Sequence, residues 1–69
     1  MTRLKLLGKN IKKYREAKGF SQNKLAELVN FSREHIGAVE TGTEFVSLRK
    51  LFEIADVLET PMKNFIDFD

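Results

Sequence analysis

The chain contains no cysteine and no tryptophan, and it has only one histidine and one proline. Without cysteine no disulfide can form, and His35 alone cannot supply the ligand set of a structural zinc site. These missing crosslinks matter because a chain of 69 residues buries little surface and has room for only a small core. We therefore expect a single domain over residues 1–69 that needs no cofactor and is stabilised by apolar packing, helped by a dimer.

Long apolar runs and strand signals are also missing. No stretch approaches the roughly 20 apolar residues that a membrane-spanning helix needs, and Arg3 and Lys5 interrupt the leucines near the start, unlike a signal peptide. We therefore expect a cytoplasmic protein with no membrane partner. An enzyme is disfavoured because there is no cysteine, no glycine-rich phosphate loop and no histidine with a carboxylate at matching spacing. Asp67 and Asp69 are clustered, but they stand close to the chain end.

Charge is unevenly distributed along the chain. The formal net charge of +2 conceals a first part, residues 1–33, with nine basic and two acidic residues, and a remainder with three basic and eight acidic residues. The first part thus carries +7 and would attract a polyanion such as nucleic acid, whereas the remainder carries −5. The same lysines could simply solvate the outer face of a helix, so charge alone does not decide between these readings.

Apolar spacings of three and four residues predict a helix over about residues 2–18, which Gly19 can end. Ser21 then offers an N-cap for a second, short helix, and Asn30 suits a left-handed turn after it. The expected inward side of the first helix consists of Leu4, Leu7, Ile11 and Tyr14. That of the second helix consists of Leu25, Ala26, Leu28 and Val29.

Three more helices are predicted in the rest of the chain. Ser32 caps a third helix that ends at Gly42, and Ser47 caps a fourth helix that breaks at residues 59–60. Thr60 and Pro61 have the pattern of an N-cap and first position of a short fifth helix carrying Met62, Phe65 and Ile66. The expected apolar stripe of the fourth helix consists of Leu48, Leu51, Phe52, Ala55 and Leu58, with Ile54 at its edge. The sequence therefore predicts an all-α fold of five helices, in which Leu25, Ile36, Val39, Leu51 and Phe52 belong to the core.

Residues 21–42, SQNKLAELVNFSREHIGAVETG, fit a tight corner between two helices. Ala26 stands where the second helix must approach the third, Asn30 takes the turn, and Phe31 seals it. Ile36 and Val39 would anchor the third helix from beneath, and a helix of this width can enter the major groove of DNA. The side chains left to project outward are those of Arg33, Glu34 and Ala38, with Gly37 beside them.

These outward residues have the chemistry of base recognition. The planar guanidinium of Arg33 can grip guanine O6 and N7, and Glu34 can accept a hydrogen bond from cytosine N4. Ala38 can touch a thymine methyl, and Gly37 lets the backbone lie close to the groove floor. Ser32 and the helix N-termini offer phosphate donors, and Arg49 and Lys50 could extend the phosphate clamp.

Nearly the whole chain resembles the Cro/C1-type helix-turn-helix family of phage-repressor-like regulators. The resemblance is carried by LGKNIKKYREAKGFSQNKLAELVNFS, by VETG and by SLRKLFEIADVL. It implies a five-helix, lambda-repressor-like DNA-binding domain in which Gln22 holds a phosphate and buttresses the recognition helix. It also implies base reading from Arg33, Glu34 and Ala38, and an interior ion pair between Arg15 and Glu40, although these two could equally be solvated surface charges.

The sequence departs from the family pattern at three places. Lys24 replaces a glutamate that often completes a capping box with Ser21, and it could hold a phosphate instead. Asn30 replaces the usual glycine of the turn. Thr43 and Glu44 occupy a loop that is often basic in relatives, so DNA affinity is expected to be modest. The full expected DNA-binding set is Gln22, Asn23, Lys24, Ser32, Arg33, Glu34, His35, Gly37, Ala38, Thr43 and Arg49, where His35 is either a phosphate contact, a pH sensor or an ordinary surface residue.

The C-terminal residues suggest a dimer. A domain this small cannot bury Phe65, Ile66 and Phe68 together, so we expect Met62 and Phe65 to turn inward and Ile66 and Phe68 to form a homodimer interface. The predicted function is sequence-specific transcriptional regulation, as a repressor or autoregulator bound to a palindromic DNA operator, with RNA polymerase as a further partner. The acidic second half keeps an alternative open, a protein-interaction module of the same fold, antitoxin-like or coactivator-like.

Overall fold

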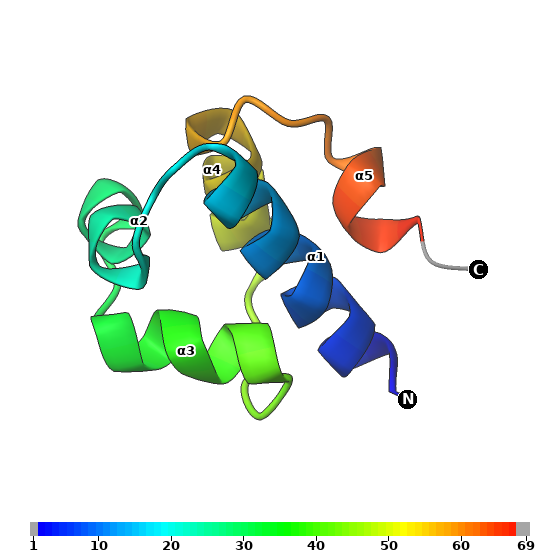
Figure 1. Ribbon diagram of the computed structural model, residues 1–69. Coiled ribbons are helices and arrows are strands. Elements are labelled where there is room, and N and C mark those ends of the chain that lie inside the picture. The colour runs from blue at the N-terminus through cyan, green and yellow to red at the C-terminus, as the bar shows by residue number, and fades with distance from the viewer. Residues whose placement is uncertain (1, 68–69) are drawn as a thin grey trace.

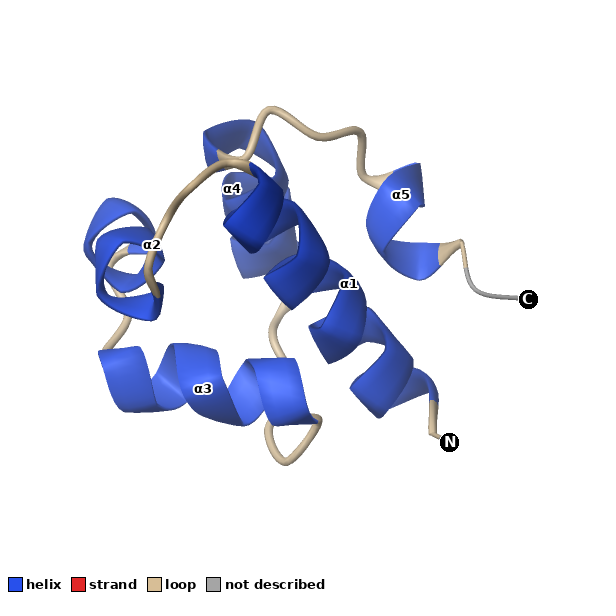
Figure 2. Ribbon diagram, in the orientation of Figure 1, coloured by secondary structure: helices blue, strands red, loops and turns tan. Residues whose placement is uncertain are grey.

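The computed structural model describes residues 2–67, which form five helices and, within that range, no strand. The helices are α1 (Arg3–Ala17), α2 (Gln22–Val29), α3 (Arg33–Thr41), α4 (Leu48–Val57) and α5 (Lys63–Ile66). Figure 1 shows α1 in the middle, between α5 and the pair formed by α2 and α3, with α4 behind it. The all-helical prediction is confirmed, as the single colour of the elements in Figure 2 makes plain. Within the described range, no helix combines the length and the apolar character that crossing a membrane requires.

Short polar side chains begin the helices where the sequence predicted. The hydroxyl oxygens of Ser21, Ser32 and Ser47 accept the backbone N–H three residues later, at 3.0, 3.0 and 3.1 Å. Each bond satisfies an N–H that the first helical turn leaves without a partner. Asn30, at φ 59°, and Gly42, at φ 79°, end α2 and α3 in the left-handed region. These local bonds fix the short α2–α3 link and therefore the angle at which α3 leaves α2.

The core is formed by one face of each helix. It consists of Ile11, Leu25, Ala26, Val29, Ile36, Val39, Leu51, Ile54, Ala55, Leu58 and Phe65. The predicted stripe of α4 is wrong in its rotation, because Ile54 is fully buried whereas Leu48 is 63% and Phe52 50% exposed. Leu51, Ile54, Ala55 and Leu58 follow the spacing of three and four that one helix face requires, and this leaves the other two apolar residues beside the core. Leu28, expected on the inner side of α2, is likewise 45% exposed.

The start of α5 also differs from the prediction. Thr60 does not cap this helix, because its hydroxyl donates backwards to the carbonyl of Leu58, at 3.0 Å. Pro61 precedes the helix, and its carbonyl accepts the N–H of Asn64 at 3.0 Å, so the chain enters α5 through a tight turn without a side-chain cap. The predicted N-cap at Thr60 and first helical position at Pro61 are therefore wrong, and α5 begins two residues later, at Lys63.

Phe65 is the residue that holds this single turn in place. Its side chain is fully buried, and its ring meets the edge of Tyr14 with the centroids 5.5 Å apart. The carbonyl of Phe65 accepts a hydrogen bond from the side-chain amide of Asn10 at 2.9 Å. The inward position predicted for Phe65 is thus confirmed, and α5 is anchored to α1.

Candidate nucleic-acid interface

The corner between α2 and α3 is closed by Phe31 and braced by Lys50. The N–H of Phe31 donates to the carbonyl of Ala26 at 2.8 Å, and its ring packs partly buried against the core. Lys50 Nζ lies 4.9 Å from the centroid of this ring and donates to the carbonyl of Val29, at the end of α2, at 2.7 Å. Its other partner is Glu53, also at 2.7 Å. Lys50 was expected to extend a phosphate clamp, and the structure shows that its ammonium is engaged in the corner itself.

Arg15 and Glu40 form a buried ion pair between α1 and α3. Arg15 Nε lies 2.6 Å from Glu40 Oε2, and the exposed fractions of the two side chains are 8% and 2%. A second bond joins Arg15 Nη2 to Glu40 Oε1 at 3.1 Å, and Nη1 donates to the carbonyl of Phe20 at 2.7 Å. The hydrogen bond to Glu40 raises the pKa of Arg15 against the opposing effect of burial. The pair that the family resemblance implied is thus present and interior.

Gln22 joins this network from the first residue of α2. Its amide Nε2 donates to Glu40 Oε1 at 2.9 Å. A Cβ added at Gly37 would lie 3.8 Å from both polar atoms of the Gln22 side chain, so this amide lies beside the middle of α3. Three helices therefore meet at the carboxylate of Glu40, which fixes the position of α3.

Gly8 allows α1 to cross α3 at very short range. A Cβ at this position would overlap the main-chain oxygens of Val39 and Glu40. At the end of α3, a Cβ on Gly42 would lie 2.6 Å from Cγ of Lys5. The sequence analysis missed Gly8, although a glycine inside an otherwise regular helical pattern is a signal of close backbone approach.

The outer face of α3 carries the predicted base-reading residues together. Arg33 and Glu34 are exposed in its first turn, while Gly37 and Ala38 are half-buried one turn later. Only the Gln22 side chain would come within 4 Å of a Cβ at Gly37, apart from neighbouring main chain, so the helix backbone is accessible here. The structure brings these four residues to one face, as the sequence predicted.

The predicted phosphate-binding residues lie at the start of α2, at the start of α3, in the loop after α3 and at the start of α4. Asn23 and Lys24 are exposed in the first turn of α2, and Arg49 is exposed in the first turn of α4. Ser32 accepts the N–H of His35, which leaves its own hydroxyl proton free to donate. Thr43 is exposed, but its hydroxyl donates to the carbonyl of Ala38 at 3.1 Å, so its first role is to close the end of α3.

His35 lies against Phe31 rather than free on the outer face. The two rings are stacked with centroids 4.0 Å apart and planes inclined by 12°. His35 Nε2 is 3.8 Å from a carboxylate oxygen of Glu44, in the loop after α3. The imidazole is therefore held between the turn that begins α3 and the loop that follows it.

Several large apolar side chains outside α3 are exposed. Ile66, one of the two predicted dimer residues, is 54% exposed, whereas Phe68 lies outside the described residues. Leu48 and Phe52, which follow one another by one turn on α4, and Phe45 in the preceding loop are exposed as well. These three were not predicted as exposed, because Leu48 and Phe52 were expected on the inward apolar stripe of the fourth helix and Phe45 was given no role.

Comparison with known proteins shows to which family the α2–α3 corner belongs. The family described as helix-turn-helix matches residues 11–65. Control protein C.SmaI of Serratia marcescens is 36% identical over 55 residues, which are 80% of this chain and 66% of that protein, just under two thirds of its length. The crystal structure of the restriction-modification controller protein C.AhdI from Aeromonas hydrophila is similar, with a TM-score of 0.82 and 33% identity over 91% of this chain and 94% of that one.

A third relative is similar in structure and was solved with DNA. The master regulator for biofilm formation SinR, in complex with DNA, has a TM-score of 0.81 and 27% identity over 88% of this chain and 98% of that one. The two solved structures share the fold of this chain, and all three relatives are regulators by their names. Together with the α2–α3 corner, they establish that the chain belongs to the Cro/C1-type branch of the helix-turn-helix family.

Proposed function

We propose that the protein is a sequence-specific, DNA-binding regulator of transcription that inserts α3 into the major groove. The observation that carries this proposal is the accessible face of α3 on a corner fixed from behind by Arg15, Glu40 and Gln22. Sequence readout needs side chains held in one register against base edges, and this buried network supplies such a register.

Each residue of the outer face has a distinct part in this proposal. Arg33 pairs with a guanine, Glu34 accepts from a cytosine, and Ala38 packs against a thymine methyl group. Gly37 lets the helix backbone come near the groove floor. A good bidentate contact such as that of Arg33 typically discriminates between bases by about 1–3 kcal/mol.

The residues that border α3 hold the DNA backbone. Helix N-termini favour phosphate because their N–H groups point outward and their dipole is positive there. The proposed phosphate-binding residues are Gln22, Asn23, Lys24, Ser32, His35, Thr43 and Arg49. These contacts position the protein and carry no direct sequence information.

We further propose that the regulator acts as a homodimer on an inverted repeat. A two-fold dimer presents two recognition helices to one side of DNA, with half-site centres about one helical turn apart. The exposed Ile66 is the proposed interface residue, together with Phe68. Bound in this way, the protein occludes a promoter or contacts RNA polymerase.

Salt dependence separates this function from that of a protein-interaction module. Displacement of counterions from DNA makes the affinity fall steeply between about 0.05 and 0.2 M salt, whereas an apolar protein interface responds weakly. We expect a steep fall for a labelled pool of duplexes, and a roughly equal loss of affinity for all sequences in Gln22→Ala. A protein that leaves duplex DNA unbound at low salt would reject the proposed function.

A narrower candidate role is control of restriction-modification genes. It is favoured by the likeness to C.AhdI, a restriction-modification controller that the match covers over 94% of its length, so a protein of this size can serve as such a controller. Binding sites recovered from genomic DNA would then lie upstream of genes for a restriction endonuclease or its partner methyltransferase. Sites found only at unrelated genes would exclude this role and leave the general one intact.

A further inference from the structure

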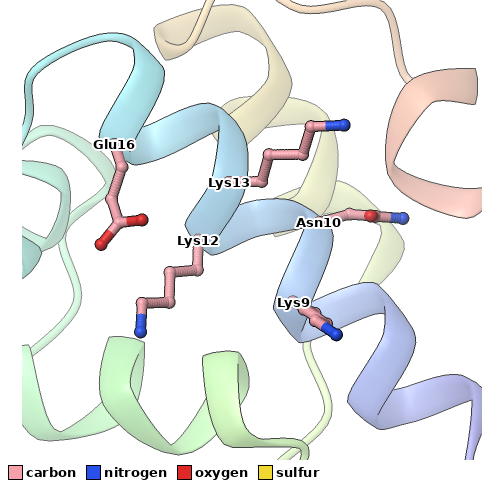
Figure 3. A pocket seen from close by; sticks show the side chains of 5 residues that line it. All are labelled: Lys9, Asn10, Lys12, Lys13 and Glu16. Atoms are coloured by element: carbon pink, nitrogen blue, oxygen red, sulfur yellow. The ribbon is translucent and has the colours of Figure 1, made fainter.

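Three lysines form a stripe along α1. Lys5, Lys9 and Lys12 follow one another at spacings of four and three residues, so their side chains leave the same side of the helix, and all three are exposed. Gly8, the point of closest approach to α3, lies between the first two of them in sequence. Lys5 passes the end of α3 at Gly42, and Figure 3 shows Lys12 extending from α1 toward α3. The stripe therefore runs beside the recognition helix.

The ammonium groups of this stripe are not neutralised within residues 2–67. Other cations of the chain are paired there, Arg15 with Glu40, Lys18 with Glu59 and Lys50 with Glu53. No hydrogen bond or ion pair to a described residue engages the ammonium of any lysine in the stripe. Like charges at helical spacing repel one another, so the arrangement is unfavourable until an anion binds.

The N-terminus of α2 is a second source of positive potential on the same side of α3. Gln22, the first residue of α2, bonds to Glu40 and lies beside Gly37, so the N-terminus of α2 opens toward this edge of the recognition helix. The loop after α3 differs, because its residues 43–46 contain no cation and include Glu44. Positive charge is thus concentrated on the α1 and α2 side of the proposed DNA-reading face.

We propose that Lys5, Lys9 and Lys12 bind consecutive backbone phosphates of duplex DNA beside the groove that α3 enters. This inference rests on the proposed function and extends its phosphate-binding set to α1. From Lys5 to Lys12 the helix rises about 10 Å, which is comparable with about three steps from phosphate to phosphate along one strand, at about 3.4 Å of DNA axis per step. Glu16, one turn beyond Lys12, ends the stripe with a carboxylate that repels phosphate.

Lys13 provides a matched control for the test. It is an exposed lysine on the same helix, but Figure 3 shows its side chain extending toward α5, away from α3, and its Nζ lies 5.3 Å from the Tyr14 ring centroid. The affinity for a duplex would be measured between about 0.05 and 0.2 M salt for Lys9→Gln, Lys12→Gln, their double variant and Lys13→Gln. Melting curves of each variant show whether the fold is retained.

Each stripe substitution is expected to reduce the slope of log K against log salt by about 0.9, and the double variant by about 1.8. Lys13→Gln should leave the slope unchanged, and Glu16→Gln should tighten binding severalfold at low salt. If Lys13→Gln lowered the slope as much as Lys12→Gln, or if no variant changed it, the stripe would not contact phosphate. A wild-type protein that does not bind duplex DNA would instead reject the proposed function, and the stripe with it.

Discussion

Glu40 is the residue at which α1, α2 and α3 are joined. Its carboxylate accepts from Arg15 and Gln22 and is almost fully buried. Removing it would leave a buried guanidinium without its partner, which typically costs about 3–5 kcal/mol. We therefore expect Glu40→Ala to lower the free energy of unfolding by this amount in urea denaturation.

A double variant provides the control for this prediction. Arg15→Met with Glu40→Leu removes both charges and keeps apolar volume, so it should be less destabilised than Glu40→Ala alone. A Glu40→Ala variant as stable as the wild type would mean that the pair is superficial.

Glu59 has an unfavourable backbone conformation and a favourable ion pair. Its φ of 52° lies in the left-handed region, and its carboxylate pairs with Lys18, which lowers the pKa of Glu59. Because the pKa in the folded state lies below that in the unfolded state, the pair stabilises the fold above the unfolded-state pKa. This stabilisation is lost as the pH falls through the lowered value.

Two substitutions separate these effects. Glu59→Gln should be less stable than the wild type at neutral pH and equally stable in strong acid, as followed by thermal melting across pH. Glu59→Gly should be more stable than Glu59→Gln at every pH, because glycine adopts a positive φ without strain. A wild type and a Glu59→Gln variant that differ equally at all pH values would contradict the ion-pair account.

At the scale of the helices, replacing glycine by alanine should have opposite effects on stability at Gly8 in α1 and at Gly37 in α3. Gly8→Ala places a methyl group on the main chain of α3, so we expect a loss of about 1–3 kcal/mol in stability. Gly37→Ala meets only the Gln22 side chain, at 3.8 Å, so we expect a gain of roughly 0.5–1 kcal/mol from better helix propensity. Denaturation curves of the two variants measure both effects.

DNA binding of Gly37→Ala then isolates the functional role of this residue. If the backbone of α3 approaches the groove floor, the methyl group should weaken binding although the fold is more stable. Unchanged affinity would mean that α3 is held farther from the bases at this position.

The helices could be predicted from the sequence because their signals are local. Ser21, Ser32 and Ser47 cap backbone groups only three residues away, and Asn30 adopts the left-handed turn within its own residue. The outward face of α3 followed from the same reasoning, since burial of Ile36 and Val39 determines which side remains accessible.

What could not be predicted depends on contacts between helices. Six apolar residues among the ten of α4 fit more than one face, and packing alone places Ile54 inside and Phe52 outside. In the sequence Lys50 looks like an ordinary surface cation, because only the packing of α2 places the Val29 carbonyl within hydrogen-bond distance of its ammonium. The Arg15 and Glu40 pair was available only through the family resemblance, because nothing in the spacing of two residues 25 positions apart indicates contact.

At the scale of the whole molecule, the proposed dimer residue Ile66 lies on a different helix from the basic surface. The DNA-reading face and the lysine stripe lie on α1, α2 and α3, while Ile66 is exposed on α5. A dimer formed through α5 would therefore leave the DNA-reading face and the lysine stripe free. We expect Ile66→Asp to yield a folded protein that is monomeric at micromolar concentration in sedimentation and binds a full site more weakly, since it loses bivalent docking.

Leu28→Asp is the matched control, because Leu28 is an apolar residue of similar exposure on α2. It should leave the dimer unchanged. An Ile66→Asp variant that stays dimeric would place the interface elsewhere, with Leu48 and Phe52 on α4 as the next surface to test.

Selection of binding sites from random duplexes, performed in parallel with the wild type and Arg33→Ala, tests most directly that α3 reads DNA sequence. The wild type should enrich two inverted half-sites with centres about 10 base pairs apart. Arg33→Ala should keep this arrangement and lose preference at one base pair of each half-site, at a cost of about 1–3 kcal/mol there. An Arg33→Ala consensus identical to that of the wild type, or no enriched sequence at all, would contradict the account.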